Sequence, residues 1–209
     1  MSHPPHVPAL TRLGASAMRV MHRITQGYDP VFLSQLLHQL GPRELMRWGA
    51  EVTAIVEAIE RELDPAATQH VIAFAALFNG CRVCSVGHMY AGNLELFDAT
   101  GRLFPIDERD VFELQCLEDD ELLWELGQRL TDEYQETFDR TALLYELKTD
   151  VRSPRTALDH LLLRAVAAWD ILADSTVLCT VDDPAEIDPL TPIAKNRPLR
   201  QRYATARGR

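Results

Sequence analysis

The sequence lacks the features that define several large classes of protein. It has only four cysteines among 209 residues, too few for a small secreted domain stabilised mainly by disulfides. Its longest uncharged apolar run, Val71 to Phe78, is far shorter than the roughly 20 residues of a membrane-spanning helix. The first residues, Met1 to His6, have neither the basic flank nor the apolar core of a signal peptide. We therefore expect a cytoplasmic protein with no membrane partner.

Acidic residues outnumber basic ones in the chain as a whole, but the C-terminus is basic. The formal net charge is -10, which argues against a surface built to bind nucleic acid. Residues 195–209 nevertheless contain six basic residues and no acidic one. The preceding stretch, 181–192, contains three prolines, which interrupt both helices and sheets. We expect one helical domain over 1–180 and an extended, Pro-rich and then basic tail over 181–209. The tail is expected to lie on an acidic body, its own or that of a neighbouring subunit.

Apolar residues at helical spacing dominate the rest of the chain. They repeat at intervals of three and four, and no segment shows sustained alternation with a period of two. Asp29-Pro30, Asp64-Pro65 and Ser153-Pro154 resemble helix starts, in which a capping residue precedes a first-turn proline. Helices are predicted over about 10–24, 32–40, 42–63, 65–78, 81–97, 108–114 and 119–146, with a possible interruption at Gly127, and a last one follows Pro154. The sequence therefore predicts an all-α fold.

One short cluster, Cys81, Cys84 and His88, has the residue types and spacing of a reactive site. Along a helix, three residues advance by about 300° and seven by about 700°, so all three side chains share one stripe. Side chains three or four positions apart have Cβ atoms about 5–6 Å apart, which permits a Cys81–Cys84 disulfide and places His88 near Cys84. A thiol in the first turn of a helix commonly has its pKa lowered from about 8.5 to between 3.5 and 7.5. The spacing alone does not settle which cysteine attacks.

Other interpretations of this cluster compete with a redox site. A zinc site needs about four ligands, so a fourth would have to come from Cys116, Cys179, His70 or His160. A c-type haem site needs a histidine directly after the second cysteine, where this chain has Ser85. The simplest alternative is two small buried cysteines beside an incidental histidine. We expect Cys116 and Cys179 to be buried, unreactive thiols, and Trp48, Trp124 and Trp169 to pack in the interior.

The segment from Gln69 to Phe97 resembles the alkylhydroperoxidase D-like family of the carboxymuconolactone decarboxylase superfamily. The family motif is a glutamate, eleven residues, a cysteine, two residues, a cysteine, three residues and a histidine. Cys81, Cys84 and His88 match its last three members, and Asn79 and the apolar helix before it also look like family members. The resemblance implies an all-α homo-oligomer that works as a thiol peroxidase or disulfide reductase and requires no cofactor. It further implies a peroxide or disulfide substrate and a reductant of the thioredoxin or lipoyl type.

The same resemblance implies a role for each residue of the cluster. Cys84 would attack the peroxide and become a sulfenic acid, Cys81 would resolve it as a disulfide, and His88 would belong to the proton relay. The sequence departs from the family at Gln69, where the family has its glutamate, because an amide cannot exchange a proton near neutral pH.

Two neighbours are further candidates for the relay. His70 is adjacent to Gln69 but points about 100° away on a helix, and Glu95 lies seven residues beyond His88. A hydrogen-bonded core or interface histidine and a solvated carboxylate are the simpler interpretations of these two residues.

Two functional alternatives also stay open. One is a non-enzymatic helical oligomer that binds a ligand or senses redox state, and the other is a zinc-stabilised helical protein.

Overall fold

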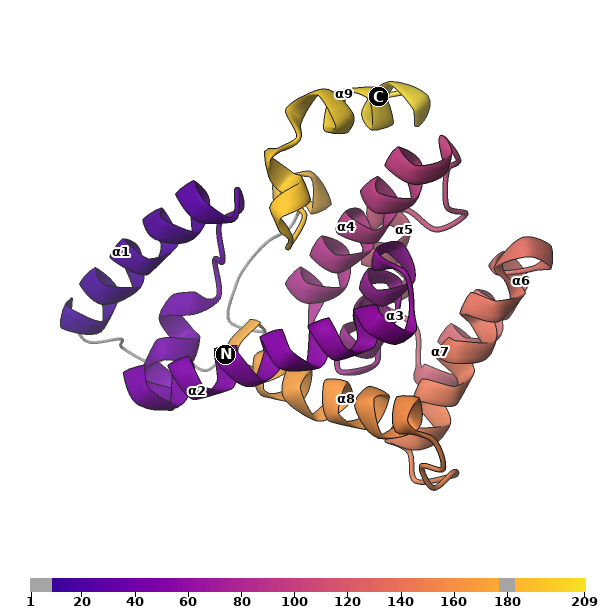
Figure 1. The fold of residues 1–209 in the computed structure, drawn as a ribbon, viewed down its shortest axis with the longest axis horizontal. Coiled ribbons are helices and arrows are strands. Elements are labelled where there is room, and N and C mark those ends of the chain that lie inside the picture. The colour runs from indigo at the N-terminus through magenta and orange to yellow at the C-terminus, as the bar shows by residue number, and fades with distance from the viewer. Residues whose placement is uncertain (1–8, 177–182) are drawn as a thin grey trace.

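Helices make up all the regular structure of the described part of the chain. The computed structural model describes residues 9–176 and 183–209, and within these ranges the prediction of an all-α fold is confirmed (Figure 1). The elements are α1 (Ala9–Thr25), α2 (Leu33–Glu62), α3 (Pro65–Phe78), α4 (Arg82–Thr100), α5 (Glu108–Leu114), α6 (Asp119–Arg129), η1 (Asp132–Tyr134), α7 (Gln135–Lys148), α8 (Ala157–Thr176), η2 (Pro184–Glu186), η3 (Pro192–Lys195) and α9 (Arg197–Ala206). None of the described helices is long and apolar enough to cross a membrane.

The helix starts and breaks follow local chemistry. Asp64 caps α3 as predicted, because its side chain accepts a hydrogen bond from the Ala67 amide and Pro65 occupies the first turn. The predicted break at Gly41-Pro42 is a kink within α2, where Gly41 has a φ of 74°. Asp29 does not cap a helix, contrary to the prediction, and instead forms ion pairs with arginines of α1.

Two other predicted boundaries are wrong by a few residues. The acidic helix breaks after Arg129 rather than at Gly127, and η1 begins there with Asp132 at a φ of 51°. Helix α8 begins at Ala157, because Thr156 caps it: the Thr156 hydroxyl oxygen accepts a hydrogen bond of 3.1 Å from the Asp159 amide. Ser153-Pro154 therefore lies outside the helix that it was predicted to start.

Helix α3 lies at the centre of the fold. Almost every one of its residues is buried, and it packs against α2, α4, α7 and α8 (Figure 1). A helix that is apolar all round belongs in such a position. Its polar residues Gln69 and His70 are buried as well, so each needs a hydrogen-bonding partner inside the protein.

The C-terminal segment is not extended, which corrects the prediction for 181–209. Residues 183–209 form two short 3-10 turns, η2 and η3, followed by the helix α9, which lies beside α4 (Figure 1). Pro184, Pro192 and Pro198 each occupy the first positions of one of these elements. Proline is tolerated there because the first amides of a helix have no intrahelical partner. The prolines therefore start these short helices instead of preventing them.

The basic residues of this segment bind acidic residues of the same chain. Arg209 forms ion pairs with Asp107 and Glu108, and Arg202 forms one with Asp98. The expected contact between the basic tail and an acidic body is therefore confirmed, and within one chain.

Two groups of apolar side chains are exposed. The apolar side chains of α1 on the side away from Ala15 are more than half exposed, and we call them the α1 apolar face: Leu13, Val20, Met21 and Ile24. Trp124 is 64% exposed, so the prediction that it packs is wrong. Helix α1 contacts the rest of the described chain mainly through α2, which leaves its other side uncovered.

Candidate redox site

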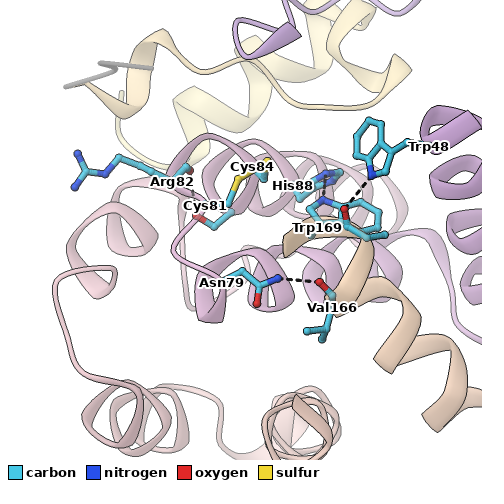
Figure 2. Close-up of a disulfide and its surroundings, with 10 residues drawn as sticks. Trp48, Asn79, Cys81, Arg82, Cys84, His88, Val166 and Trp169 are labelled. Carbon is cyan, nitrogen blue, oxygen red and sulfur yellow. Dashed lines mark hydrogen bonds between the residues drawn. A yellow bond between two sulfur atoms is a disulfide. The ribbon is translucent and has the colours of Figure 1, made fainter. Parts of the chain in front are cut away.

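A disulfide joins Cys81 and Cys84 at the start of α4 (Figure 2). Their Cα atoms are 5.5 Å apart, Cys81 is the N-cap residue, and Cys84 lies in the first turn. The chain reaches this position through Asn79 and Gly80, which end α3; Gly80 has a φ of 72° and permits the reversal. The Asn79 side-chain amide donates a 2.9 Å hydrogen bond to the Val166 carbonyl, which ties the turn to α8. Both sulfurs therefore lie at the positive end of the α4 dipole, where a thiolate is favoured.

His88 follows Cys84 by one helical turn and is held by two partners. Its Nδ1 lies 2.8 Å from Gln69 Oε1, and its Nε2 lies 3.4 Å from the indole nitrogen of Trp169 (Figure 2 shows the ring directed toward Trp169). An indole N–H can only donate, so His88 Nε2 must accept and Nδ1 must carry the proton. The proton on Nδ1 is donated to the Gln69 carbonyl oxygen.

The surroundings of His88 keep its imidazole neutral. Burial lowers the pKa of His88 to about 3, and the Gln69 amide carries no charge that would stabilise an imidazolium. The structure therefore brings Gln69 and His88 together, and it pairs the histidine with a neutral amide. His88 in this state orients and hydrogen-bonds neighbouring groups, and it is a weak base.

His70 is joined to another part of the molecule. Its Nε2 donates a 3.0 Å hydrogen bond to Asn93 Oδ1, its ring stacks on Phe104, and burial lowers its pKa to about 4. Asn93 donates in turn to the hydroxyl of Tyr203, which donates to Glu108. His70 is thus the hydrogen-bonded core histidine of the simpler interpretation, and it connects α3 to α9.

Glu95 lies further along α4 and is half-buried rather than fully solvated. Its pKa is raised, first by burial and then by the nearby carboxylates of Asp98 and Glu60. The hydrogen bonds of His88 run to Gln69 and Trp169, not to Glu95. The structure therefore does not join Glu95 directly to the proton relay.

A cavity of about 490 Å³ opens beside the disulfide. Cys84, His88 and Gln69 all line it, and it falls within the size range of small-molecule sites. Apolar side chains from α2, α8 and the C-terminal segment provide most of its wall, among them Leu33, Leu45, Val52, Val56, Leu172 and Leu190. The site therefore consists of a disulfide and an imidazole at the side of an apolar cavity.

Two tryptophans that were predicted only to pack in the interior also line this cavity. Trp169 donates to His88, and Trp48 donates a 3.0 Å hydrogen bond to the Ala168 carbonyl (Figure 2). No pattern in the sequence separates a tryptophan in a cavity wall from one in a closed core, because both lie on apolar helix faces.

The C-terminal segment covers the site at Leu190. The Leu190 amide donates a 3.1 Å hydrogen bond to the carbonyl of Gly87, and a Cβ on Gly87 would lie 2.5 Å from Leu190 Cγ. Glycine at this position, between Cys84 and His88, is what allows Leu190 to approach α4 so closely. Cys81 and Cys84 themselves have no solvent-exposed surface.

The remaining candidate ligands and thiols are elsewhere. Cys116 is exposed, so the prediction that it is buried is wrong, and Cys179 lies outside the described residues. Within residues 9–176 and 183–209, no group of three or more His, Cys, Asp or Glu side chains is placed to hold a metal ion. The zinc interpretation therefore has no ligand set in the described part of the chain.

Comparisons with protein families, with curated proteins and with solved structures found no match to this chain.

Proposed function

We propose that this protein is a thiol–disulfide oxidoreductase that resembles the alkylhydroperoxidase D-like enzymes and reduces a peroxide or a disulfide. The observation that carries the proposal is the Cys81–Cys84 disulfide in the first turn of α4, with Cys84 lining an apolar cavity. The helix terminus favours the thiolate that must form when the disulfide is reduced. A homo-oligomer working in a reducing compartment, with a thioredoxin- or lipoyl-type reductant, is part of the same proposal.

With a peroxide ROOH, the cycle has three balanced steps. The Cys84 thiol attacks one oxygen, the O–O bond breaks, and the products are Cys84 sulfenic acid and the alcohol ROH. The Cys81 thiol then attacks the sulfenic sulfur, which forms the disulfide and releases water. A partner dithiol finally attacks the disulfide, gives up two electrons and two protons, and becomes a disulfide itself. With a disulfide substrate, the Cys84 thiolate displaces one substrate thiol and forms a mixed disulfide. The Cys81 thiol then attacks the Cys84 sulfur, which forms the Cys81–Cys84 disulfide and releases the second substrate thiol.

The contact between Gln69 and His88 bears on which of these substrates is favoured. A neutral, weakly basic His88 gives little help in removing the Cys84 proton, and peroxide reduction depends on that proton transfer. Thiol–disulfide exchange needs only the two sulfurs and a thiolate, which the helix terminus favours. Disulfide exchange is therefore the better supported of the two reactions.

One observation favours a second candidate, a ligand-binding or redox-sensing module without turnover. Both cysteines are completely buried, and Leu190 closes the surface above α4. Such a module would form and break the same disulfide, but it would not process substrate repeatedly.

Steady-state kinetics in a background free of other thiols separates these functions. With Cys116 and Cys179 replaced by serine, we expect reduced protein to show two titratable thiols and to turn over cumene hydroperoxide or a small disulfide in the presence of dithiothreitol. Cys84→Ser should abolish turnover, whereas Cys81→Ser should leave a sulfenic acid that dimedone traps or a persistent mixed disulfide. Turnover that survives both substitutions contradicts the mechanism, and a single oxidation without turnover supports the redox-sensing module.

A further inference from the structure

We propose that the cavity beside Cys84 binds an elongated molecule with an apolar body and a cationic end, and that Glu57, Glu60 and Glu95 receive the cationic end. The inference deepens the proposed function, since it names the chemical class of substrate for the same site. It rests on how polar and apolar side chains are distributed along the cavity wall.

Helix α4 provides both ends of the cavity. Cys84 and His88 line it near the start of the helix, and Glu95 lines it eleven residues after Cys84. At 1.5 Å per residue, Cys84 and Glu95 are separated by about 16 Å along the helix axis. A cavity that includes both residues is elongated, with sulfur and imidazole at one end and a carboxylate at the other.

Helix α2 provides an apolar wall between these ends. Trp48, Val52 and Val56 follow one another at intervals of four residues, so they present one continuous apolar stripe. Glu57 and Glu60 continue the lining at the C-terminal end of this stripe. Burial of an apolar chain along the stripe provides the main part of the binding free energy for such a ligand.

The acidic end has no cationic partner among the residues that the structure describes. Among the described residues that line the cavity there is no lysine and no arginine, and Glu57, Glu60 and Glu95 form no ion pair in the described part of the chain. Glu60 and Asp98 both raise the pKa of Glu95, which means that these carboxylates repel one another. A bound ammonium or guanidinium group would relieve this repulsion and donate charge-assisted hydrogen bonds to the carboxylates. An anionic ligand would increase the repulsion among these carboxylates.

Two polar atoms in the wall lack a hydrogen-bonding partner among the described residues. His22 Nδ1 and Thr191 Oγ1 are shielded from solvent although both residues are only half-buried, and both residues line this cavity. Buried polar atoms are normally paired, so a ligand carrying a polar group along its length would satisfy them.

Calorimetric titration with three ligands that share one chain tests the inference. Decylammonium, decanol and decanoate, kept below their critical micelle concentrations or solubility limits, share a ten-carbon chain and carry a cationic, a neutral and an anionic end group. We expect the cation to bind about tenfold more tightly than decanol, and decanoate to bind more weakly than either. In the double variant Glu60→Gln/Glu95→Gln, the preference for the cation should largely disappear while decanol binding is unchanged.

Control variants make each outcome decisive. Glu62→Gln removes an exposed glutamate of the same helix that does not line the cavity, and it should leave the cation preference intact. Val56→Phe, which fills the apolar wall, should weaken all three ligands. Equal affinities for the cation and decanoate, or a cation preference that persists in the double variant, would overturn the inference.

The same titration distinguishes this inference from the proposed redox function. Cys84→Ser removes the redox chemistry but not the apolar wall or the carboxylates, so cation binding should persist in that variant. A protein that turns over peroxide or disulfide but shows no cation preference would retain the proposed function and lose only this inference.

Discussion

His88 donates its Nδ1 proton to the side-chain oxygen of Gln69, 2.8 Å away, so the histidine of the site is paired with an amide. Gln69→Glu would place a carboxylate at the same position. Because a negative charge favours the imidazolium, we expect the pKa of His88 to rise and the imidazole to become a usable base. Peroxide turnover should increase by about tenfold to a hundredfold, toward the usual contribution of general base catalysis.

The pH profile of peroxide turnover separates an effect on the basicity of His88 from a merely structural effect, because a structural effect would not shift the profile. Gln69→Glu should move the ascending limb of kcat/KM, and the His88 ring protons should titrate at higher pH in an NMR experiment. Gln128→Glu, which adds the same charge at an exposed position of α6, should change neither. An unchanged His88 titration in Gln69→Glu would show that this contact does not control the imidazole.

Two buried neutral histidines should make the protein sensitive to mild acid. Burial lowers the pKa of His88 to about 3 and that of His70 to about 4, from an ordinary value of 6.5. The unfolded chain therefore binds more protons than the folded one as the pH falls below 6.5, and folded stability decreases. The expected slope approaches about 1.4 kcal/mol per pH unit for each histidine.

Urea denaturation at pH 7.5, 6.0 and 5.0 measures this dependence. His70→Gln and His88→Gln should each reduce the loss of unfolding free energy, whereas His160→Gln, at an exposed position of α8, should not. Carboxyl groups whose pKa is lowered by their partners, such as Asp29 and Asp159, contribute only nearer pH 3.8 and below. A free energy of unfolding that is equal at pH 7.5 and 5.0 would contradict the neutral state of both histidines.

The fold could be predicted largely from the sequence because its signals are local. Intervals of three and four in the apolar residues identify the helices, and Asp64-Pro65 gives the start of α3 to the residue. Local signals failed at the C-terminus, where Pro184 and Pro192 were interpreted as helix breakers although they occupy first-turn positions of η2 and η3. The packing of η2 on α5 and of η3 on α4 distinguishes these two uses of proline.

The site could be predicted in part for the same reason. Cys81, Cys84 and His88 lie within eight consecutive residues, so helix geometry alone brings them together. Trp169 and Leu190 come from distant parts of the chain; Trp169 is 81 residues from His88. Such contacts depend on tertiary packing, which no spacing in the sequence encodes. The α1 apolar face shows a second limit of local signals. Its helical spacing predicts the helix, but it does not predict whether another element covers the helix, and these side chains are exposed.

Leu190 should control access to the disulfide. Gly87→Ala adds a Cβ that would lie 2.5 Å from Leu190 Cγ, so the C-terminal segment must move away from α4. Leu190→Ala removes the cover without any clash and serves as a second test if Gly87→Ala folds poorly. In both variants we expect tris(2-carboxyethyl)phosphine to reduce the Cys81–Cys84 disulfide about tenfold faster, because buried disulfides are protected by restricted access. Gly49→Ala, at a helical glycine with no neighbour near the added Cβ, should leave the rate unchanged. Equal reduction rates in all four proteins would mean that Leu190 does not limit access.

The α1 apolar face should hold copies of the chain together. Exposed apolar clusters of this kind on a single helix mark interaction surfaces, and Val20 and Ile24 are 55% and 72% exposed within one chain. If the protein is a homo-oligomer, a second copy covers these side chains, and Val20→Lys/Ile24→Lys would place two charges in the interface. We expect light scattering after gel filtration to give a multiple of 23.6 kDa for the native chain and a lower mass for the double variant. Val151→Lys, at an exposed apolar residue outside α1, should keep the native mass. A native chain that elutes as a monomer at micromolar concentration would contradict this prediction.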